Sequence, residues 1–136
     1  MIVLDASAAL ELLLDSPLGR RVGERLELEG GPFHAPHLLD VEVLHVTCRL
    51  QAGGALRAPR AAQLLEDLAA LPLERYPHLP LLTRAWSLRA SLTPYDAIYV
   101  ALAAALDATL LTCDARLGRS RGHGADVEVI DAASAP

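Results

Sequence analysis

The fold is decided by residues 93–114, TPYDAIYVALAAALDATLLTCD. Thr93 is a favourable N-cap, and Pro94 suits the first helical position because the amide hydrogen that proline lacks has no partner there. Every residue from Ala97 to Leu106 is apolar. Helices that are apolar all round are buried on every side. This stretch therefore predicts a buried helix that begins at Pro94.

One aspartate of this stretch lies in the first turn of the predicted helix, and another follows the predicted strand. Asp96 is in the first turn of the helix, and Asp114 follows a strand that we predict over Thr109–Thr112. Each has a structural explanation by itself, since Asp96 could close a capping box with Thr93 and Asp114 could cap the next helix. Together they bring two charges to the edge of an apolar core, where a carboxylate needs a cap, a counter-ion or a metal.

The rest of the chain alternates between short apolar strands and longer helices. We predict strands at Met1–Leu4, Phe33–Ala35, Leu73–Tyr76 and Val127–Ile130, and helices at Ala8–Leu14, Arg20–Glu29, His37–Ala52, Pro59–Leu71 and Leu79–Leu88. A helical turn at Ala115–Leu117 and a loop at Gly118–Gly124 follow, and Ala132–Pro136 is expected to fray. This alternation predicts an α/β fold with a central, mostly parallel sheet of four or five strands flanked by helices. The length suits a single domain over residues 1–136.

Composition excludes several classes of protein. Hydrophobic residues make up 52% of the chain, but no apolar run reaches the roughly 18 residues that a membrane-spanning helix needs. Asp5 directly follows the short apolar start, so we expect no secretory signal. Cys48 and Cys113 lack a metal-binding spacing, and without export we expect them to be free thiols in a reducing cytoplasm.

The charge pattern removes two other α/β enzyme classes. All 12 basic residues are arginine, so the chain has no lysine. A response-regulator receiver needs an acidic pair after its first strand and a lysine late in the chain. A haloacid-dehalogenase-type phosphatase needs two aspartates separated by one residue, and as a rule such a phosphatase also uses a lysine. This chain has Asp5-Ala6-Ser7 instead. Neither mechanism fits these residues.

Acids follow two of the predicted strands. Asp5 follows Met1–Leu4, and Asp114 follows Thr109–Thr112. Ligands of open parallel sheets bind beyond the carboxyl ends of the strands. If these two strands are neighbours, the two carboxylates converge, although Asp5 by itself could simply be a helix N-cap.

The predicted helix His37–Ala52 also carries two acidic residues, Asp40 and Glu42, that could contribute a carboxylate to the same crevice. Residues two apart on a helix lie about 200° apart, so these two cannot serve one site together. Asp40 lies near the helix start, where an acid interacts favourably with the dipole. Glu42 could pair with His45 or Arg49 on its own helix. The spacing alone leaves open which acid joins those at the strand ends.

A crevice with three or four carboxylates has a strong electrostatic requirement. Like charges in one pocket raise one another's pKa, so the acids cannot all stay ionised without a cation. Oxygen ligands without histidine or cysteine favour Mg²⁺ or Mn²⁺. Mg²⁺ keeps several bound waters, and such an ion can neutralise charge on a phosphate. The acids therefore predict metal-assisted hydrolysis of a phosphodiester.

Four segments carry a family resemblance. They are VLDASAAL (3–10), PHLLDVEVLHV (36–46), LTPYDAIYVALA (92–103) and LLTCDARL (110–117). In order and spacing they resemble the PIN-domain ribonucleases, and more narrowly the VapC toxins of bacterial type II toxin–antitoxin pairs. The resemblance covers nearly the whole chain. It implies a three-layer PIN-like fold, a Mg²⁺- or Mn²⁺-dependent endoribonuclease, a homodimer and a VapB-like antitoxin whose C-terminal segment covers the acidic groove.

The resemblance also assigns roles to individual acids. The four acids of the family fall on Asp5, Glu42, Asp96 and Asp114. Asp5 and Asp96 are implied as the main metal ligands, while Glu42 and Asp114 complete the cluster and position water. Glu42 is thereby selected over Asp40. A nuclease that is not a toxin and a catalytically silent protein-binding module are the alternatives.

Other residues match supporting positions of the family. Ser7 and Thr112 correspond to small polar residues that support the acids, and Asp126, the only candidate for a fifth acid, is given no role. The implied substrate is RNA, which a chain of net charge −5 must hold locally with arginine. The first candidates for this are Arg116, Arg119 and Arg121, and the second are Arg20, Arg21, Arg25, Arg84 and Arg89.

Overall fold

A five-stranded sheet forms the centre of the molecule. The structure is a computed structural model that describes residues 1–132, so most of the end expected to fray, residues 133–136, lies outside the described residues. Within that part the strands are β1 (Ile2–Leu4), β2 (Phe33–Pro36), β3 (Leu73–Tyr76), β4 (Thr109–Thr112) and β5 (Asp126–Val129). Their order is β3-β2-β1-β4-β5, and every neighbouring pair is parallel. The predicted parallel α/β sheet is confirmed, with each strand within one residue of its expected bounds.

The helices follow the predicted order, with differences of one to three residues at several of their ends and a 3₁₀ turn in one segment. They are α1 (Ala6–Leu13), α2 (Pro17–Glu29), α3 (Leu38–Ala52), α4 (Ala58–Ala70), a 3₁₀ turn (Leu79–Leu81), α5 (Leu82–Ser87), α6 (Pro94–Leu106) and α7 (Ala115–Arg119). The expected start of α2 at Arg20 is wrong, because Ser16 caps the helix by accepting a 2.9 Å hydrogen bond from the amide of Gly19. The segment expected as one helix over Leu79–Leu88 begins instead with the 3₁₀ turn.

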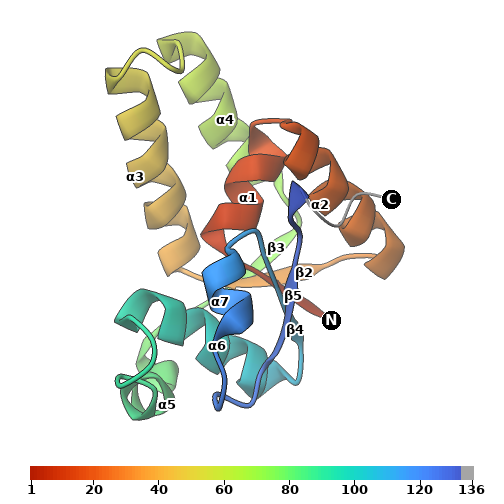
Figure 1. The fold of residues 1–136 in the computed structure, drawn as a ribbon. Helices are drawn as coiled ribbons and strands as arrows, with labels where there is room; N and C mark the ends of the chain where they lie inside the picture. The colour runs from red at the N-terminus through yellow and green to blue at the C-terminus, as the bar shows by residue number, and fades with distance from the viewer. Residues whose placement is uncertain (133–136) are drawn as a thin grey trace.

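The helices cover both faces of the sheet. Connections between parallel strands are right-handed, so α1 to α4, which lead from β1 towards β3, lie on one face. The next connection returns from β3 to β4, which places α5 and α6 on the other face. Figure 1 shows these two sides, with α3 and α4 as an antiparallel pair that extends away from the sheet. The result is three layers, with helices on each side of the sheet.

The core lies on both faces of the sheet, and one large part of it lies between α6 and the two central strands. Ile2, Val3 and Leu4 of β1 are buried, and α6 is buried from Ala97 to Ala103 and contacts β1, β2 and β4. The expectation that α6 is buried on every side is wrong for its last turn, where Ala104 and Ala105 are exposed. The six-residue helix α5 contacts α6 but is too short to cover all 13 of its residues.

The strand order also creates a crevice. From β1 the chain passes to helices on one face, and from β3 it returns over the other face to β4, so β1 and β4 are neighbours that meet at a switch point.

Both described cysteines, Cys48 and Cys113, are free, as predicted. No helix in residues 1–132 is long and apolar enough to cross a membrane.

Candidate active site

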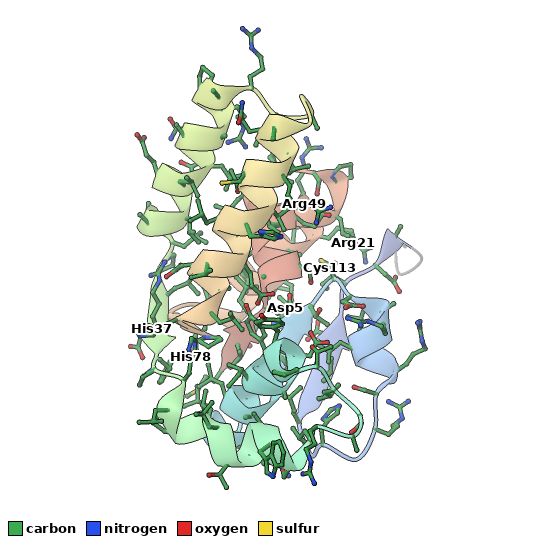
Figure 2. The ribbon with its side chains drawn as sticks, turned by 90° about the vertical axis from the view of Figure 1, so that its left-hand side faces the viewer. Asp5, Arg21, His37, Arg49, His78 and Cys113 are labelled. Atoms are coloured by element: carbon green, nitrogen blue, oxygen red, sulfur yellow. The ribbon has the colours of Figure 1, made fainter. Side chains whose placement is uncertain are left out.

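Asp5 lies directly after β1, at the carboxyl end of that strand. It is the N-cap of α1, and its Oδ1 accepts hydrogen bonds from the amide of Ala8 at 2.9 Å and from the hydroxyl of Ser7 at 2.7 Å. Only 6% of Asp5 is exposed, and Figure 2 shows it in the middle of the molecule. The structural role that the sequence allowed for Asp5 is therefore real, and it fixes the carboxylate in one orientation.

Two hydroxyl groups join Asp5 to the end of β4. Thr112 donates a short hydrogen bond to Oδ2 of Asp5, and its Oγ accepts one from the amide of Asp114 at 3.0 Å. Ser7 accepts a hydrogen bond from the amide of Cys113 at 3.0 Å. Thr112 and Ser7 are 3.2 Å apart between their hydroxyl oxygens. The residues predicted to support the acids thus contact Asp5 directly and link the ends of β1 and β4.

Burial makes an ionised Asp5 unfavourable in the metal-free chain. It raises the pKa of Asp5 to about 6 from a usual value of 3.8. Hydrogen bonds from Thr112, Ala8 and Ser7 oppose this effect, and the neighbouring charge of Asp114 adds to it. The groups that hydrogen-bond to Asp5 are neutral, so a nearby cation would relieve an unbalanced charge.

Asp114 caps the next helix and carries a counter-ion. Its Oδ1 accepts a hydrogen bond from the amide of Arg116 at 2.9 Å, as expected for an N-cap of α7. The Nη2 atom of Arg116 donates to Oδ2 of Asp114 at 2.9 Å. Burial raises the pKa of Asp114, but the hydrogen bonds and charge of Arg116 exceed that effect and hold the pKa below its usual value.

Asp96 approaches the same place from α6. The hydroxyl of Thr93 accepts a 3.2 Å hydrogen bond from the backbone amide of Asp96. This contact is the predicted N-cap of the helix. Its Oδ2 accepts a second hydrogen bond from Nη2 of Arg116 at 3.3 Å. One guanidinium therefore bridges Asp96 and Asp114.

Glu42 reaches the crevice from α3 and is held by Tyr99. The hydroxyl of Tyr99 donates a 2.7 Å hydrogen bond to Oε1 of Glu42. Burial raises the pKa of Glu42, and the charge of Asp96 raises it further. Burial and then the charges of Glu42 and Asp5 raise the pKa of Tyr99, so this side chain lies near both acids.

Sequence reasoning missed Tyr99. It stands one helical turn after Asp96, in a helix whose other buried residues are aliphatic. A buried tyrosine normally needs a hydrogen-bond partner for its hydroxyl, and that requirement was the available signal.

Asp40 points to a different part of the molecule. Its Oδ2 accepts a 2.8 Å hydrogen bond from Nε of Arg75, which lies on β3. Glu42 faces α6 instead, as the angle between the two residues on α3 requires. In the described chain the hydrogen bond of Glu42 goes to Tyr99 and not to His45 or Arg49.

Asp5, Glu42, Asp96 and Asp114 lie near one another, but their carboxylates do not converge on a single point. Within residues 1–132, no three histidine, cysteine, aspartate or glutamate side chains converge closely enough to hold an ion. The carboxylates are instead engaged by hydrogen-bond donors, above all Arg116 and Tyr99. Their chemistry, carboxylate oxygen throughout, fits Mg²⁺ or Mn²⁺, and the metal ligand set itself stays a prediction.

The other predicted arginines differ in their surroundings. Arg119 and Arg121 are exposed, whereas Arg20 pairs with Asp15 and Arg25 pairs with Glu128. The remaining second candidates contact backbone carbonyl groups: Arg21 at Asp131, Arg84 at His123 and Arg89 at Trp86.

Asp126 lies away from the acids. Asp126 is paired in register with Thr109, at the opposite end of β4. Its carboxylate accepts a 2.8 Å hydrogen bond from the hydroxyl of Thr109. This position explains why no role fits Asp126 at the crevice.

This fold and its acidic crevice are those of a defined class of α/β protein. The PIN-domain sequence profile matches residues 2–122. Ribonuclease VapC12 of Mycobacterium tuberculosis is 42% identical over 139 residues, which cover 96% of this chain and 99% of that protein. Ribonuclease VapC9 of the same species is 43% identical over 119 residues, covering 86% and 88%. The chain belongs to the VapC group of the PIN-domain family.

The fold has close counterparts among solved structures. A DNA-bound VapBC structure from Salmonella typhimurium matches 96% of this chain and 96% of its own, with a TM-score of 0.72 and 17% sequence identity. At this identity the likeness concerns the fold alone.

Proposed function

We propose that this chain is a metal-dependent endoribonuclease that hydrolyses RNA phosphodiester bonds and is the toxic component of a VapBC-type pair. The observation that carries the proposal is the approach of acids from β1, α3, α6 and β4 to one end of the sheet. Its 42% identity to a protein named Ribonuclease VapC12 supports the same activity. A single PIN domain over residues 1–136 and a cytoplasmic location belong to the proposal.

The four acids have different roles in this proposal. Asp5 and Asp96 hold Mg²⁺ or Mn²⁺, while Glu42 and Asp114 complete the ligand set and orient water. When bound, the ion supplies an activated water and neutralises charge that develops on the phosphate. Burial of Asp5 supports this role, because a desolvated carboxylate interacts more strongly with a cation than an exposed one does.

The supporting hydroxyls keep Asp5 in a fixed orientation. Ser7 and Thr112 each donate to a different oxygen of the carboxylate. Such contacts orient metal ligands and commonly matter nearly as much as the ligands themselves.

RNA is held in this proposal by cationic groups beside the acids. Arg119 and Arg121 are exposed, and they follow Asp114 closely in the chain. Arg116 is near the same place and is paired with Asp96 and Asp114. Local arginines are required because the whole chain is acidic and phosphate binding needs positive charge.

An antitoxin partner is supported by a groove beside Glu42. Apolar side chains of α1 and α3 line it, among them Leu10, Leu38 and Val41. Val41 is 62% exposed, so part of the apolar lining of this groove is open to a partner. An apolar segment with cationic residues would suit this groove and the adjoining acids, and we assign that role to a VapB-like antitoxin.

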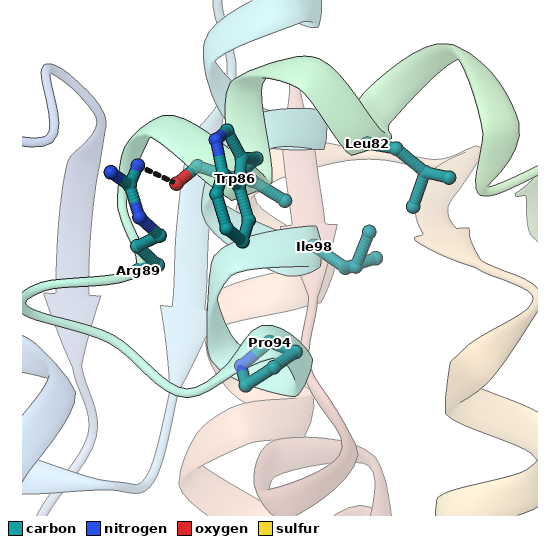
Figure 3. Close-up of a pocket in the computed structure, with 6 residues that line it drawn as sticks. Leu82, Trp86, Arg89, Pro94 and Ile98 are labelled. Carbon is teal, nitrogen blue, oxygen red and sulfur yellow. Dashed lines mark hydrogen bonds between the residues drawn. The ribbon is translucent and has the colours of Figure 1, made fainter.

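A homodimer is supported by a second apolar surface, between α5 and α6. Figure 3 shows its pocket, which is lined by Leu82, Trp86, Arg89, Pro94 and Ile98. Trp86 is 67% exposed, and the guanidinium of Arg89 lies 4.2 Å from the centre of its ring. We propose that a second copy of the chain covers this surface. Substitution Trp86→Glu is then expected to give a monomer in size-exclusion chromatography with light scattering, and an unchanged mass would contradict the dimer.

The test of the nuclease proposal is an RNA cleavage assay with the purified chain. We expect cleavage with Mg²⁺ or Mn²⁺, none with EDTA, and none for Asp5→Asn or Asp96→Asn at matched concentrations. Circular dichroism shows whether each variant keeps its fold. Full cleavage by both variants would refute the assigned roles, and inactivity of the unmutated chain with either ion would favour a silent protein-binding module.

The toxin proposal needs a separate test. We expect expression of the unmutated chain without a partner to arrest bacterial growth, and co-expression of the antitoxin to restore it. Harmless expression at high level, together with RNA cleavage in vitro, would identify a PIN-domain nuclease that is not a toxin.

A further inference from the structure

A positively charged group already lies among the acids. Nη2 of Arg116 donates to Asp114 at 2.9 Å and to Asp96 at 3.3 Å. These acids come from different elements, the start of α6 and the cap of α7. Building on the proposed function, we infer that Arg116 is a resident counter-ion of this site, and that it competes with a divalent metal ion for Asp96 and Asp114.

The local geometry holds Arg116 in this position. Asp114 receives the backbone amide of Arg116 on one oxygen and its guanidinium on the other, so both oxygens are engaged by a single residue. A divalent ion bound to Asp114 and Asp96 would lie in contact with this guanidinium. Two positive charges at such a separation repel each other, and both compete for the same carboxylate oxygens. Binding of the metal therefore favours departure of the guanidinium.

The same structure makes that departure easy. The side chain of Arg116 is 66% exposed, whereas those of Asp96 and Asp114 are 24% and 31% exposed. Exposed ion pairs are weak because water and salt replace the interaction at little cost. Arg116 can swing into solvent without breaking contacts in the core. It therefore reduces the affinity for metal by a modest factor and does not block the site.

A neighbouring arginine provides a matched comparison. Arg119 lies on the same short helix and is also exposed, yet no hydrogen bond or ion pair connects it to an acid among the described residues. Removing either side chain changes the net charge by the same amount. A difference between the two variants therefore reports the contact with Asp96 and Asp114.

The experiment is a calorimetric titration of the full chain with Mn²⁺, without RNA. We expect Arg116→Ala to bind Mn²⁺ about three- to tenfold more tightly than the unmutated chain, the range that loss of exposed ion pairs allows. Arg119→Ala should differ from the unmutated chain by less than about twofold. The rise in melting temperature caused by Mn²⁺ should also be larger for Arg116→Ala, because tighter ligand binding stabilises the folded state more.

The outcomes separate this inference from the proposed function. If Arg116→Ala binds Mn²⁺ no more tightly than Arg119→Ala does, competition by Arg116 is wrong while the metal site stands. If the unmutated chain, Arg116→Ala and Asp5→Asn all fail to bind Mn²⁺, the metal site is wrong and the inference falls with it. Circular dichroism of both arginine variants controls for folding, which these exposed substitutions should leave intact.

Discussion

The hydroxyl of Tyr99 donates a 2.7 Å hydrogen bond to the carboxylate of Glu42. It joins α6 to α3 across the end of the sheet, over a separation of 57 residues in the chain. Tyr99 is itself 3% exposed, so its ring cannot move freely. The contact holds Glu42 toward the other acids and away from the solvent-facing side of α3.

Tyr99→Phe should therefore reduce RNA cleavage while preserving the fold. Removing a partner that orients a metal-site ligand typically costs roughly 10- to 100-fold in activity or metal affinity. Single-turnover cleavage rates with Mn²⁺ measure the loss. Tyr76→Phe is the matched control, because its hydroxyl hydrogen-bonds to His34 and Glu74 and to none of the four acids of the site. Equal rates for the two variants would contradict a positioning role of Tyr99.

Asp5→Asn should gain stability relative to the unmutated chain as the pH rises to neutral, even as it abolishes cleavage. Burial raises the pKa of Asp5 from 3.8 to about 6, so the folded state holds its proton more tightly than the unfolded state does. The stabilisation that Asp5 provides is thus complete below pH 3.8 and is lost as the pH rises through about 6. The variant carries no charge there and escapes this loss.

Urea unfolding in EDTA at pH 4, near the lower end of this window, and at pH 7.5, above its upper end, measures the effect. The difference in free energy of unfolding between variant and unmutated chain should shift in favour of the variant by up to roughly 3 kcal/mol, at 1.36 kcal/mol per pKa unit. A difference that is independent of pH would show that Asp5 is not desolvated in solution.

Thr112→Val should impair both the site and the fold. It removes the hydroxyl that donates to Asp5 and accepts from the amide of Asp114. Leaving buried polar atoms without partners costs about 1–3 kcal/mol in the free energy of unfolding. Thr109→Val is the control on the same strand, since that hydroxyl contacts Asp126 at the far end. We expect only the change at position 112 to reduce cleavage, and similar losses from both would argue against support by Thr112.

Gly19→Ala should destabilise the chain through the packing of α1 against α2. A Cβ atom at Gly19 would lie far inside van der Waals contact of the Glu11 carbonyl, which is backbone and cannot rotate away. Overpacking of this kind costs about 1–3 kcal/mol.

Gly23→Ala is the control for that substitution. It lies on the same helix and meets only the side chain of Leu12, at 3.4 Å. Alanine is the better helix former by up to about 1 kcal/mol, so this change should be neutral or stabilising. Urea midpoints distinguish the two, and equal midpoints would contradict the close approach of the helices at Gly19.

The sequence alone determined the order of elements and the positions of the acids along them. Apolar runs, caps and the spacing of helical residues are local features, and they predicted each strand within one residue and the caps at Thr93 and Asp114. The boundary it missed, at α2, depended on Ser16, which is also a local signal. Local chemistry could thus be read without knowing the fold.

Only the tertiary structure decided which side chains meet. Helix spacing separated Asp40 from Glu42 but did not say which faced the crevice, because that depends on how α3 packs on β3 and α6. Arg75 lies 35 residues from Asp40 and takes that acid out of the site. Arg116 was predicted to hold RNA, yet packing brings it between two acids. Contacts between distant residues arise from the packing of whole elements, which no local pattern encodes.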